Sequence, residues 1–272
     1  MVDAPRTNAA RRGGGDAMSR LHGLAAALAV LGGVSGVRAE VPTTRAPTPA
    51  HVWSFDGPMG RFDMASVQRG YAVYNQVCSA CHGMAAVTYG DLAGIGLNEA
   101  QVRQIAASHK VPGPLDDDGH PTRRPATPND HLLSPFPNPQ AAMRANSGVV
   151  PPDQSRLAMV FPGGPSRIYA LLTSYGPAPA GMTIAPGHAY NPYFDGRQTA
   201  MPQPLRDHQV TYADGTDATL AREAEDVTNF LAWAAWPHLA ERHRIGARIV
   251  LYLVFLFVLT ILLKRKVWSH VH

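Results

Sequence analysis

The sequence has only two cysteines among its 272 residues, and they lie three positions apart. Two neighbouring thiols exclude the disulfide framework typical of small secreted domains. Charge is also sparse: 16% of the residues are charged, and no dense run of lysine and arginine precedes the C-terminal end. The lack of a basic patch argues against nucleic-acid binding. The sequence shows no repeat of fixed period, so it does not indicate a solenoid or a propeller.

Proline and glycine, in contrast, are abundant, with 24 and 25 residues respectively. Such a composition predicts long irregular loops. We expect residues 111–139 to be one of them, a surface excursion of the kind that tends to be functional. Its Asp116, Asp117 and Asp118 form either a plain solvated loop or a patch that attracts a basic partner protein.

The remaining segments show helical periodicity. Asp63 is the expected N-cap of a helix that ends at the cysteines. Further helices are expected after Asn98, over residues 166–175 and after a cap at Asp217, whereas strands are not evident. The predicted fold class is therefore mainly α, with long irregular loop insertions.

Residues 1–39 are typical of a secretory signal peptide. Arginines precede an apolar stretch over residues 21–40, and the residues up to Ala39 supply a plausible cleavage site. Met18 is a possible start that would leave a leader of ordinary length. The arginine-rich, acid-poor beginning also fits a transit peptide, and that alternative stays open.

A second apolar run extends from Ile245 to Leu263 and is broken only by Arg248. About 20 apolar residues are needed to cross a bilayer, so we predict one transmembrane anchor helix over residues 244–264. Basic residues and Trp268 follow at the far interface. With the leader directing export, residues 40–243 are expected to form an exported domain and residues 265–272 a short cytoplasmic tail.

Both cysteines belong to Cys78-Ser79-Ala80-Cys81-His82, which is the C-x-x-C-H pattern of c-type haem attachment. Two thiols at this spacing can add to the two vinyl groups of a haem, and the next residue points its imidazole at the iron. Export agrees with this interpretation, because covalent attachment takes place outside the cytoplasm. The motif therefore predicts one covalently bound haem c.

A zinc site and a redox-active thiol pair are the two other possible functions of the cysteines. A zinc half-site would need two more ligands, and no H-x₃₋₅-H pair lies at a finger-like distance along the chain from the cysteines. A thioredoxin-like redox pair would need a βαβ context, which the sequence does not indicate. Both alternatives are therefore weaker than haem attachment.

The sixth iron ligand decides whether the iron is closed to other molecules, and a thioether also raises the reduction potential. Met201 lies in a segment stiffened by Pro202 and Pro204, which can hold a sulfur at the iron at little ordering cost. Met182, in another loop, is the second candidate. An ordinary packing role for Met201 is an equal alternative on these grounds.

Two further motifs are candidate haem contacts. Arg144 is suited to pair with a haem propionate, although an isolated arginine is more often a surface residue. Pro151 and Pro152 are expected on the His82 side, where a backbone carbonyl would accept the second imidazole N–H and orient the ring. A plain turn is the alternative for the two prolines.

Taken together, the motifs resemble the cytochrome c1 family, the haem c subunits of ubiquinol–cytochrome c oxidoreductase (cytochrome bc1) complexes. The resemblance covers nearly the whole chain after the leader. Its segments are WSFDGPMGRFD, QRGYAVYNQVCSACHGM, SPFPNPQAAMRANSGVVPPDQS, YALLTSYG, NPYFDGRQTAMPQPL, FLAWAAWPHLAERHRIG and VLTILLKRKVWSHVH. The proline-rich middle motif and the Met-Pro segment make it specific, because C-x-x-C-H alone names only the cofactor.

The resemblance implies a c-type cytochrome fold with haem c bound by Cys78, Cys81 and His82. It also implies that Met201 is the axial methionine and Arg144 a propionate partner. A subunit of this family takes one electron from the Rieske iron–sulfur protein, passes it to cytochrome c and assembles with cytochrome b. We accordingly expect no independent catalysis and a location in a bacterial inner membrane, with the haem domain in the periplasm.

The sequence departs from the family at Arg197 and Gln198, where small residues are usual, and this puts the packing near Met201 in doubt. Two other functions stay open. One is a haem enzyme or gas-binding protein with an open iron site. The other is the cytochrome c subunit of a terminal oxidase.

Overall fold

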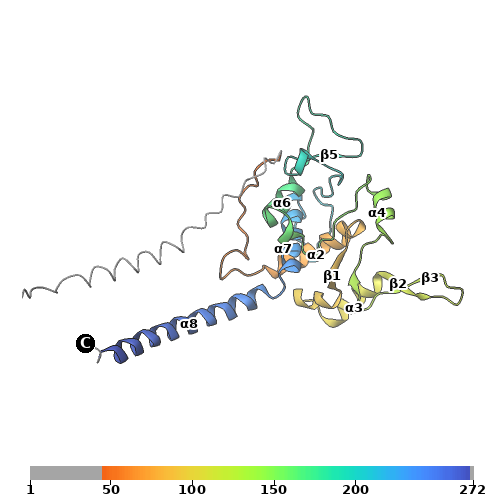
Figure 1. Ribbon diagram of the computed structural model, residues 1–272. Coiled ribbons are helices and arrows are strands. Elements are labelled where there is room, and N and C mark those ends of the chain that lie inside the picture. The colour runs from red at the N-terminus through yellow and green to blue at the C-terminus, as the bar shows by residue number, and fades with distance from the viewer. Residues whose placement is uncertain (1–44, 270–272) are drawn as a thin grey trace, which may run out of the picture. The chain divides into compact units, whose positions relative to one another are not determined.

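The computed structural model of the chain describes residues 45–269, so the predicted leader, 1–39, lies outside the described residues. Helix accounts for 45% and strand for 10% of these residues, which confirms the prediction of a mainly α fold. Figure 1 shows α2, α6 and α7 close together, with the β2 and β3 strands extending to one side and α8 projecting to the other.

The centre of the fold is the packing of α2 (Met64–Gln76) against α7 (Leu220–Ala235). Asp63 caps α2 as predicted, because its carboxylate accepts the backbone N–H groups of Ala65 and Ser66. Gly70 lies directly against the Asp226 backbone, where any side chain would overlap the Asp226 carbonyl oxygen. The absence of a side chain at this position therefore lets the two helices approach closely.

A buried ion pair fixes the register of these two helices. The fully buried Asp226 carboxylate accepts hydrogen bonds from Arg69 Nε at 2.8 Å and Ser66 Oγ at 2.6 Å. Asn229 Nδ2 donates to the same Ser66 hydroxyl at 2.9 Å. A buried carboxylate is tolerated only when it is paired and hydrogen-bonded, so these contacts hold α2 in one position along α7.

The other face of α7 is covered by α5 (Leu157–Val160) and α6 (Gly164–Thr173). The α6 helix confirms the run predicted at 166–175. Its buried Arg167 donates from Nε to Tyr193 O at 2.8 Å and from Nη1 to Pro162 O at 3.0 Å. Arg167 thereby ties the segment that precedes Met201 to the core.

The prediction that residues 111–139 have no regular structure was wrong. Strands β2 (Lys110–Leu115) and β3 (Pro121–Pro125) form an antiparallel hairpin. The backbone bonds of such a hairpin need no apolar alternation, which is why the sequence did not reveal it. Asn98 caps the preceding α3 (Glu99–Ser108) as predicted, through a reciprocal capping box with Gln101.

The remaining elements are short. Four short strands pair into two further antiparallel ladders, so the chain contains strands that the sequence did not indicate. The elements are β1 (Met84–Thr88) with β4 (His131–Leu132), β5 (Ala189–Tyr190) with β6 (Gln198–Thr199), α4 (Pro139–Ala145), and the 3-10 turns η1 (Cys78–Ala80), η2 (Gly90–Ile95) and η3 (Asp195–Arg197).

The predicted cap of α7 was also wrong. Thr219, not Asp217, is the N-cap, and its hydroxyl accepts the N–H of Arg222 at 3.3 Å. Asp207 supplies a second acceptor, to Leu220 N at 2.8 Å. This contact comes from a distant segment, so the local pattern around Asp217 could not indicate where the helix begins.

The last element is α8 (Leu239–Trp268), a helix of 30 residues in which no side chain is buried. Pro237 separates it from α7, as predicted. It is long and apolar enough to cross a membrane, and the anchor predicted at residues 244–264 lies within it. The domain limits proposed from the sequence stay predictions.

Candidate functional site

The cysteine motif follows directly on α2 and folds into one tight turn. The amide groups of Cys81 and His82 both donate to Cys78 O, at 3.1 and 2.9 Å. This turn, η1, keeps the two free thiols and the imidazole within one short stretch at the end of the helix. The packing of α2 on α7 therefore determines where all three side chains lie.

The imidazole of His82 is oriented by the double-proline segment. Its Nδ1 lies 2.8 Å from Pro152 O. Because a carbonyl oxygen can only accept, Nδ1 carries the proton and Nε2 keeps its lone pair. Burial lowers the pKa of His82, which favours the neutral ring that binds metals. The carbonyl contact expected from the sequence is present, whereas the role of the ring at an iron stays a prediction.

Several contacts hold Pro152 in place, and the sequence analysis did not find them. Asp153 Oδ2 accepts Ala85 N at 2.6 Å, and Ser155 Oγ accepts Ala86 N at 2.9 Å. Gln154 N donates to Gly83 O at 2.9 Å. Residues 153–155 thus run along the chain that follows His82. The only sequence signal was their position directly after the two prolines.

The surroundings of the cysteines favour neither alternative function. Among residues 45–269, neither cysteine belongs to a group of three or more residues that could hold a metal ion, which argues against the zinc site. The sheets of these residues are all two-stranded and antiparallel, so no βαβ unit carries the motif as a thioredoxin-like pair would require. Burial raises the pKa of Cys78 to about 12, with the neighbouring Cys81 adding to the effect.

Met201 is held at its backbone from two sides. Its N–H donates to Thr199 Oγ1 at 3.1 Å, and Tyr175 OH donates to its carbonyl oxygen at 3.1 Å. The side chain is partly buried and packs on the same hydrophobic core as Cys78, whereas Met182 does not join that core. Which of the two methionines binds an iron stays a prediction. Sequence reasoning missed Tyr175.

The unusual residues before Met201 are accommodated by the loop. Arg197 adopts a left-handed backbone conformation, with φ of 56°. Gln198 Oε1 accepts the N–H of Ala185 at 2.9 Å, and its backbone pairs with Tyr190 in the β5–β6 ladder. Gln198 therefore links two loops.

Arg144 is not brought into a defined contact. It lies in the last turn of α4, exposed, and within residues 45–269 it makes no hydrogen bond or ion pair. Such an arginine is free to pair with an anionic group. Its role at a propionate stays a prediction.

The residues around the motif fit a haem. His82 offers a neutral nitrogen, two thiols lie on the preceding turn, and Val149 and Val150 precede the double proline with 47% and 44% of their surfaces exposed. Apolar side chains of this kind gain stability when a flat apolar group covers them. These residues therefore combine a nitrogen ligand for iron, two thiols for the vinyl groups and an apolar surface.

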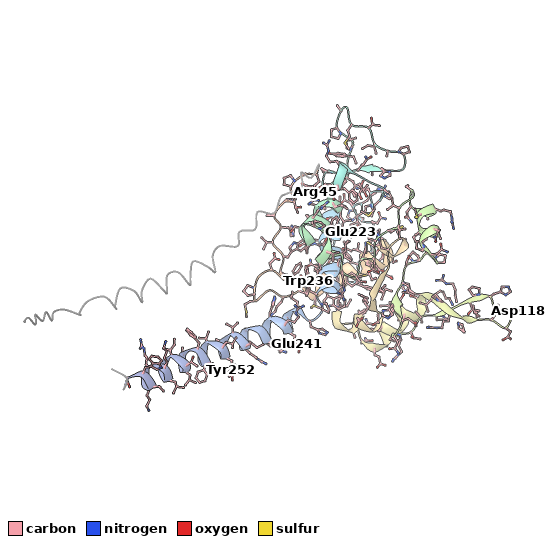
Figure 2. The ribbon with its side chains drawn as sticks, viewed as in Figure 1. Arg45, Asp118, Glu223, Trp236, Glu241 and Tyr252 are labelled. Carbon is pink, nitrogen blue, oxygen red and sulfur yellow. The ribbon has the colours of Figure 1, made fainter. Side chains whose placement is uncertain are left out.

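Asp116, Asp117 and Asp118, expected to form either a solvated loop or a docking patch, lie at the end of the β2–β3 hairpin. Figure 2 shows Asp118 far from Glu223. Asp116 Oδ1 accepts the N–H groups of Asp118 and His120, at 3.1 and 2.7 Å. These bonds are typical of a turn, so part of the patch closes the hairpin.

Comparisons with known proteins agree with this site. A model of the cytochrome C1 family matches residues 53–271. The chain is 42% identical over 222 residues to the mitochondrial protein "Cytochrome c1, heme protein" of Saccharomyces cerevisiae, covering 81% of this chain and 72% of the yeast protein. It is 41% identical over 235 residues to "Cytochrome c1" of Rhodospirillum rubrum, covering 80% and 86% of the two chains.

A third relative is organised differently. The "Cytochrome b/c1" of Bradyrhizobium diazoefficiens is 38% identical over 271 residues, which are 92% of this chain but only 39% of that protein. The matched region of this relative is therefore part of a much longer chain.

Proposed function

Since the chain belongs to the cytochrome c1 family, the haem-carrying electron-transfer subunits of the bc1 complex, we propose that it takes single electrons from a Rieske iron–sulfur protein and passes them to a cytochrome c. The membership itself accounts for a c-type haem and a membrane anchor. The donor and the acceptor are the proposed part.

The observation that carries the proposal is the hydrogen bond between His82 Nδ1 and Pro152 O. It fixes the tautomer and the orientation of the ring, so Nε2 is ready to bind iron without a change of proton. In the proposed site Cys78 and Cys81 would hold the haem through thioether links, and His82 and Met201 would bind its iron. A bound haem iron supplies a reversible one-electron carrier, and the chain contributes its orientation and its potential.

The environment of Met201 supports a closed iron. Its backbone is fixed by Thr199 and Tyr175, so the sulfur needs little additional ordering. Two protein ligands would leave no open position for oxygen or peroxide chemistry. We therefore propose an electron carrier without catalysis of its own.

The partners follow from the family and from the anchor. The longer relative named for both cytochrome b and cytochrome c1 supports cytochrome b as a neighbour of this chain. A single C-terminal helix, α8, would hold the haem domain at the membrane surface. We propose the periplasmic face of a bacterial inner membrane, on which the donor and acceptor proteins would dock.

The test is to purify the native complex and to identify its subunits by mass spectrometry. Recovery of cytochrome b and a Rieske protein, together with a pigment that stays on the chain after acid–acetone extraction, is the expected result. Recovery of terminal oxidase subunits would assign the chain to that enzyme. Rapid binding of carbon monoxide to the reduced protein would instead indicate an open iron site.

A further inference from the structure

Met201 follows a segment of the chain that closes on itself. Strands β5 and β6 pair with each other, and the segment between them is closed by a hydrogen bond of 3.0 Å from Asn191 N to Arg197 O. Thr199, at the end of β6, accepts the N–H of Met201 at 3.1 Å. Residues 189–199 therefore form one unit, and the position of this unit determines where the backbone of Met201 lies.

Helix α6 holds this unit at two points. Arg167 Nε donates to Tyr193 O at 2.8 Å, and Asn191 Nδ2 donates to Leu171 O at 2.7 Å. Leu171 belongs to the last turn of α6, where the carbonyl groups have no partner within the helix. The Asn191 side chain therefore completes the end of α6 and fastens the unit to it.

A third contact reaches Met201 itself. Tyr175, two residues beyond the end of α6, donates from its hydroxyl to Met201 O at 3.1 Å. Arg167, Leu171 and Tyr175 are four positions apart, which is about one helical turn. The contacts therefore follow the length of α6, one for each turn.

The contacts to the unit are shielded from water. Asn191 is 0% and Arg167 1% exposed, and a buried polar group that loses its partner finds no water to replace it. The ion pair of Asp195 with Arg45 holds the same unit from the surface, with 63% of the Asp195 side chain exposed. Exposed ion pairs contribute little, so α6 is the main support of the unit.

The same helices also determine the position of His82. Helix α6 packs on α7, and α7 packs on α2, which leads into the cysteine motif (Figure 1). The two proposed iron ligands are thus held by one stack of three helices. A ligand held in place before it binds avoids the entropic cost of ordering a free loop. The contacts on α6 therefore act on the ligand that would close the iron.

We propose that Arg167, Asn191 and Tyr175 are positioning residues of the axial methionine. They hold Met201 where its sulfur can stay on the iron, and this inference rests on the proposed function, in which His82 and Met201 bind the haem. Loosening the unit would leave the iron without its sulfur ligand for part of the time. Because a thioether raises the reduction potential and closes the iron to other molecules, both properties would change together.

The experiment compares single variants of the haem-loaded full chain in detergent, by redox titration and by carbon monoxide binding to the reduced protein. Tyr175→Phe removes one hydroxyl and its bond to Met201 O. We expect the fraction that binds carbon monoxide at a fixed pressure to rise roughly fivefold, the net value of one hydrogen bond, and the reduction potential to fall. Tyr169→Phe is the matched control and should change neither, because the Tyr169 hydroxyl, on the same helix, has no hydrogen-bond partner within residues 45–269.

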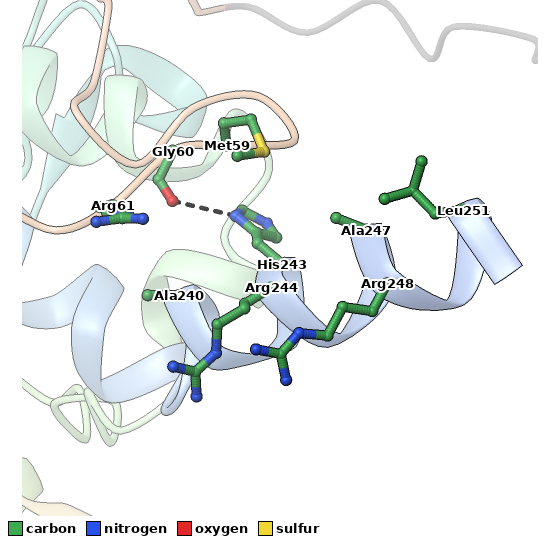
Figure 3. A pocket seen from close by; sticks show the side chains of 9 residues that line it. All are labelled: Met59, Gly60, Arg61, Ala240, His243, Arg244, Ala247, Arg248 and Leu251. Carbon is green, nitrogen blue, oxygen red and sulfur yellow. Dashed lines mark hydrogen bonds between the residues drawn. The ribbon is translucent and has the colours of Figure 1, made fainter.

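Asn191→Leu is the second variant. It leaves the Leu171 carbonyl and the Tyr193 N–H without their partners, so carbon monoxide binding should rise about tenfold or more. His243→Leu is the matched control, since it also removes a side-chain bond to a backbone carbonyl. Figure 3 shows that bond on α8, where His243 Nδ1 donates to Gly60 O at 3.1 Å.

Carbon monoxide binding and potentials equal to those of the controls would overturn the proposal, even if Tyr175→Phe and Asn191→Leu melt at lower temperatures. The contacts would then stabilise the fold alone. If Asn191→Leu does not fold, Tyr175→Phe decides. Met201→Ala, measured alongside, separates this inference from the proposed function. No effect of Met201→Ala would remove the ligand assignment and the inference with it, whereas an effect of Met201→Ala without one of Tyr175→Phe would remove only the positioning role.

Discussion

Gly70 of α2 and Asp226 of α7 approach so closely that a single methyl group on Gly70 would overlap the Asp226 carbonyl oxygen. Helix α2, which leads into the cysteine motif, therefore packs directly on the backbone of α7. Four predictions follow from this packing and from the contacts around the site.

Gly70→Ala should destabilise the protein by about 3 kcal/mol or more, because backbone atoms cannot move aside as a flexible side chain would. Thermal unfolding of the haem-loaded protein measures the effect. Gly176→Ala is the control, since the space around Gly176 is open, and it should leave the melting temperature nearly unchanged. A melting temperature for Gly70→Ala equal to that of the control would contradict the close helix contact.

Asp226→Ala should cost about 3 to 5 kcal/mol, because it leaves the guanidinium of Arg69 without its buried partner. A guanidinium stays protonated at ordinary pH even without a partner, so Arg69 cannot become neutral in this variant. Asp214, the exposed partner of the same arginine, is the comparison. Asp214→Ala should cost less than about 1 kcal/mol, and urea denaturation of both variants distinguishes the two contributions.

Met201→Ala should lower the reduction potential by about 0.1 V or more, given that axial ligands tune haem potentials over about 0.8 V. It should also let the reduced protein bind carbon monoxide. Redox titration and absorption spectroscopy record both effects. Met182→Ala should change neither, and the reverse pattern would transfer the ligand role to Met182.

Glu223 is fully buried on α7, and one of its carboxylate oxygens has no hydrogen-bond partner among residues 45–269. Burial raises its pKa above the ordinary value of 4.5. The folded state therefore binds the proton more tightly than the unfolded state, and the stability contribution of Glu223 falls as the pH rises from about 4.5 through the folded pKa. Figure 2 shows Glu223 within the helical part of the molecule.

Glu223→Gln removes this titration and should gain stability relative to the natural protein as the pH rises across that window. Urea denaturation at several pH values measures the difference. A relative loss for Glu223→Gln with rising pH would mean that the hydrogen bond from Val210 N stabilises the ionised carboxylate more than burial disfavours it.

The helices near the site could be predicted because their signals are local. Asp63 and Asn98 cap the helices that follow them through bonds to residues two or three positions away. The cap of α7 was misplaced by two residues because Asp207, twelve positions before the cap, contributes to the start of that helix. The β2–β3 hairpin was not predicted because its strands are rich in proline and charged residues and lack the apolar alternation typical of a strand.

In the site, too, local motifs could be predicted and contacts between distant segments could not. The C-x-x-C-H turn and the carbonyl of Pro152 were predictable, since each belongs to a motif with a known chemical purpose. Tyr175 was not, because its bond to Met201 O joins segments 26 residues apart. Nor did any pattern in the sequence indicate that residues 153–155 would run along the chain after His82.

Only residues 236–238 separate the end of α7 from the start of α8. A fully extended chain of that length reaches about 10 Å, so the haem domain has very little freedom to travel away from its anchor. In the proposed chain of electron carriers, this subunit would then be the stationary member. Under that proposal, any movement between donor and acceptor would come from the proteins on either side of it.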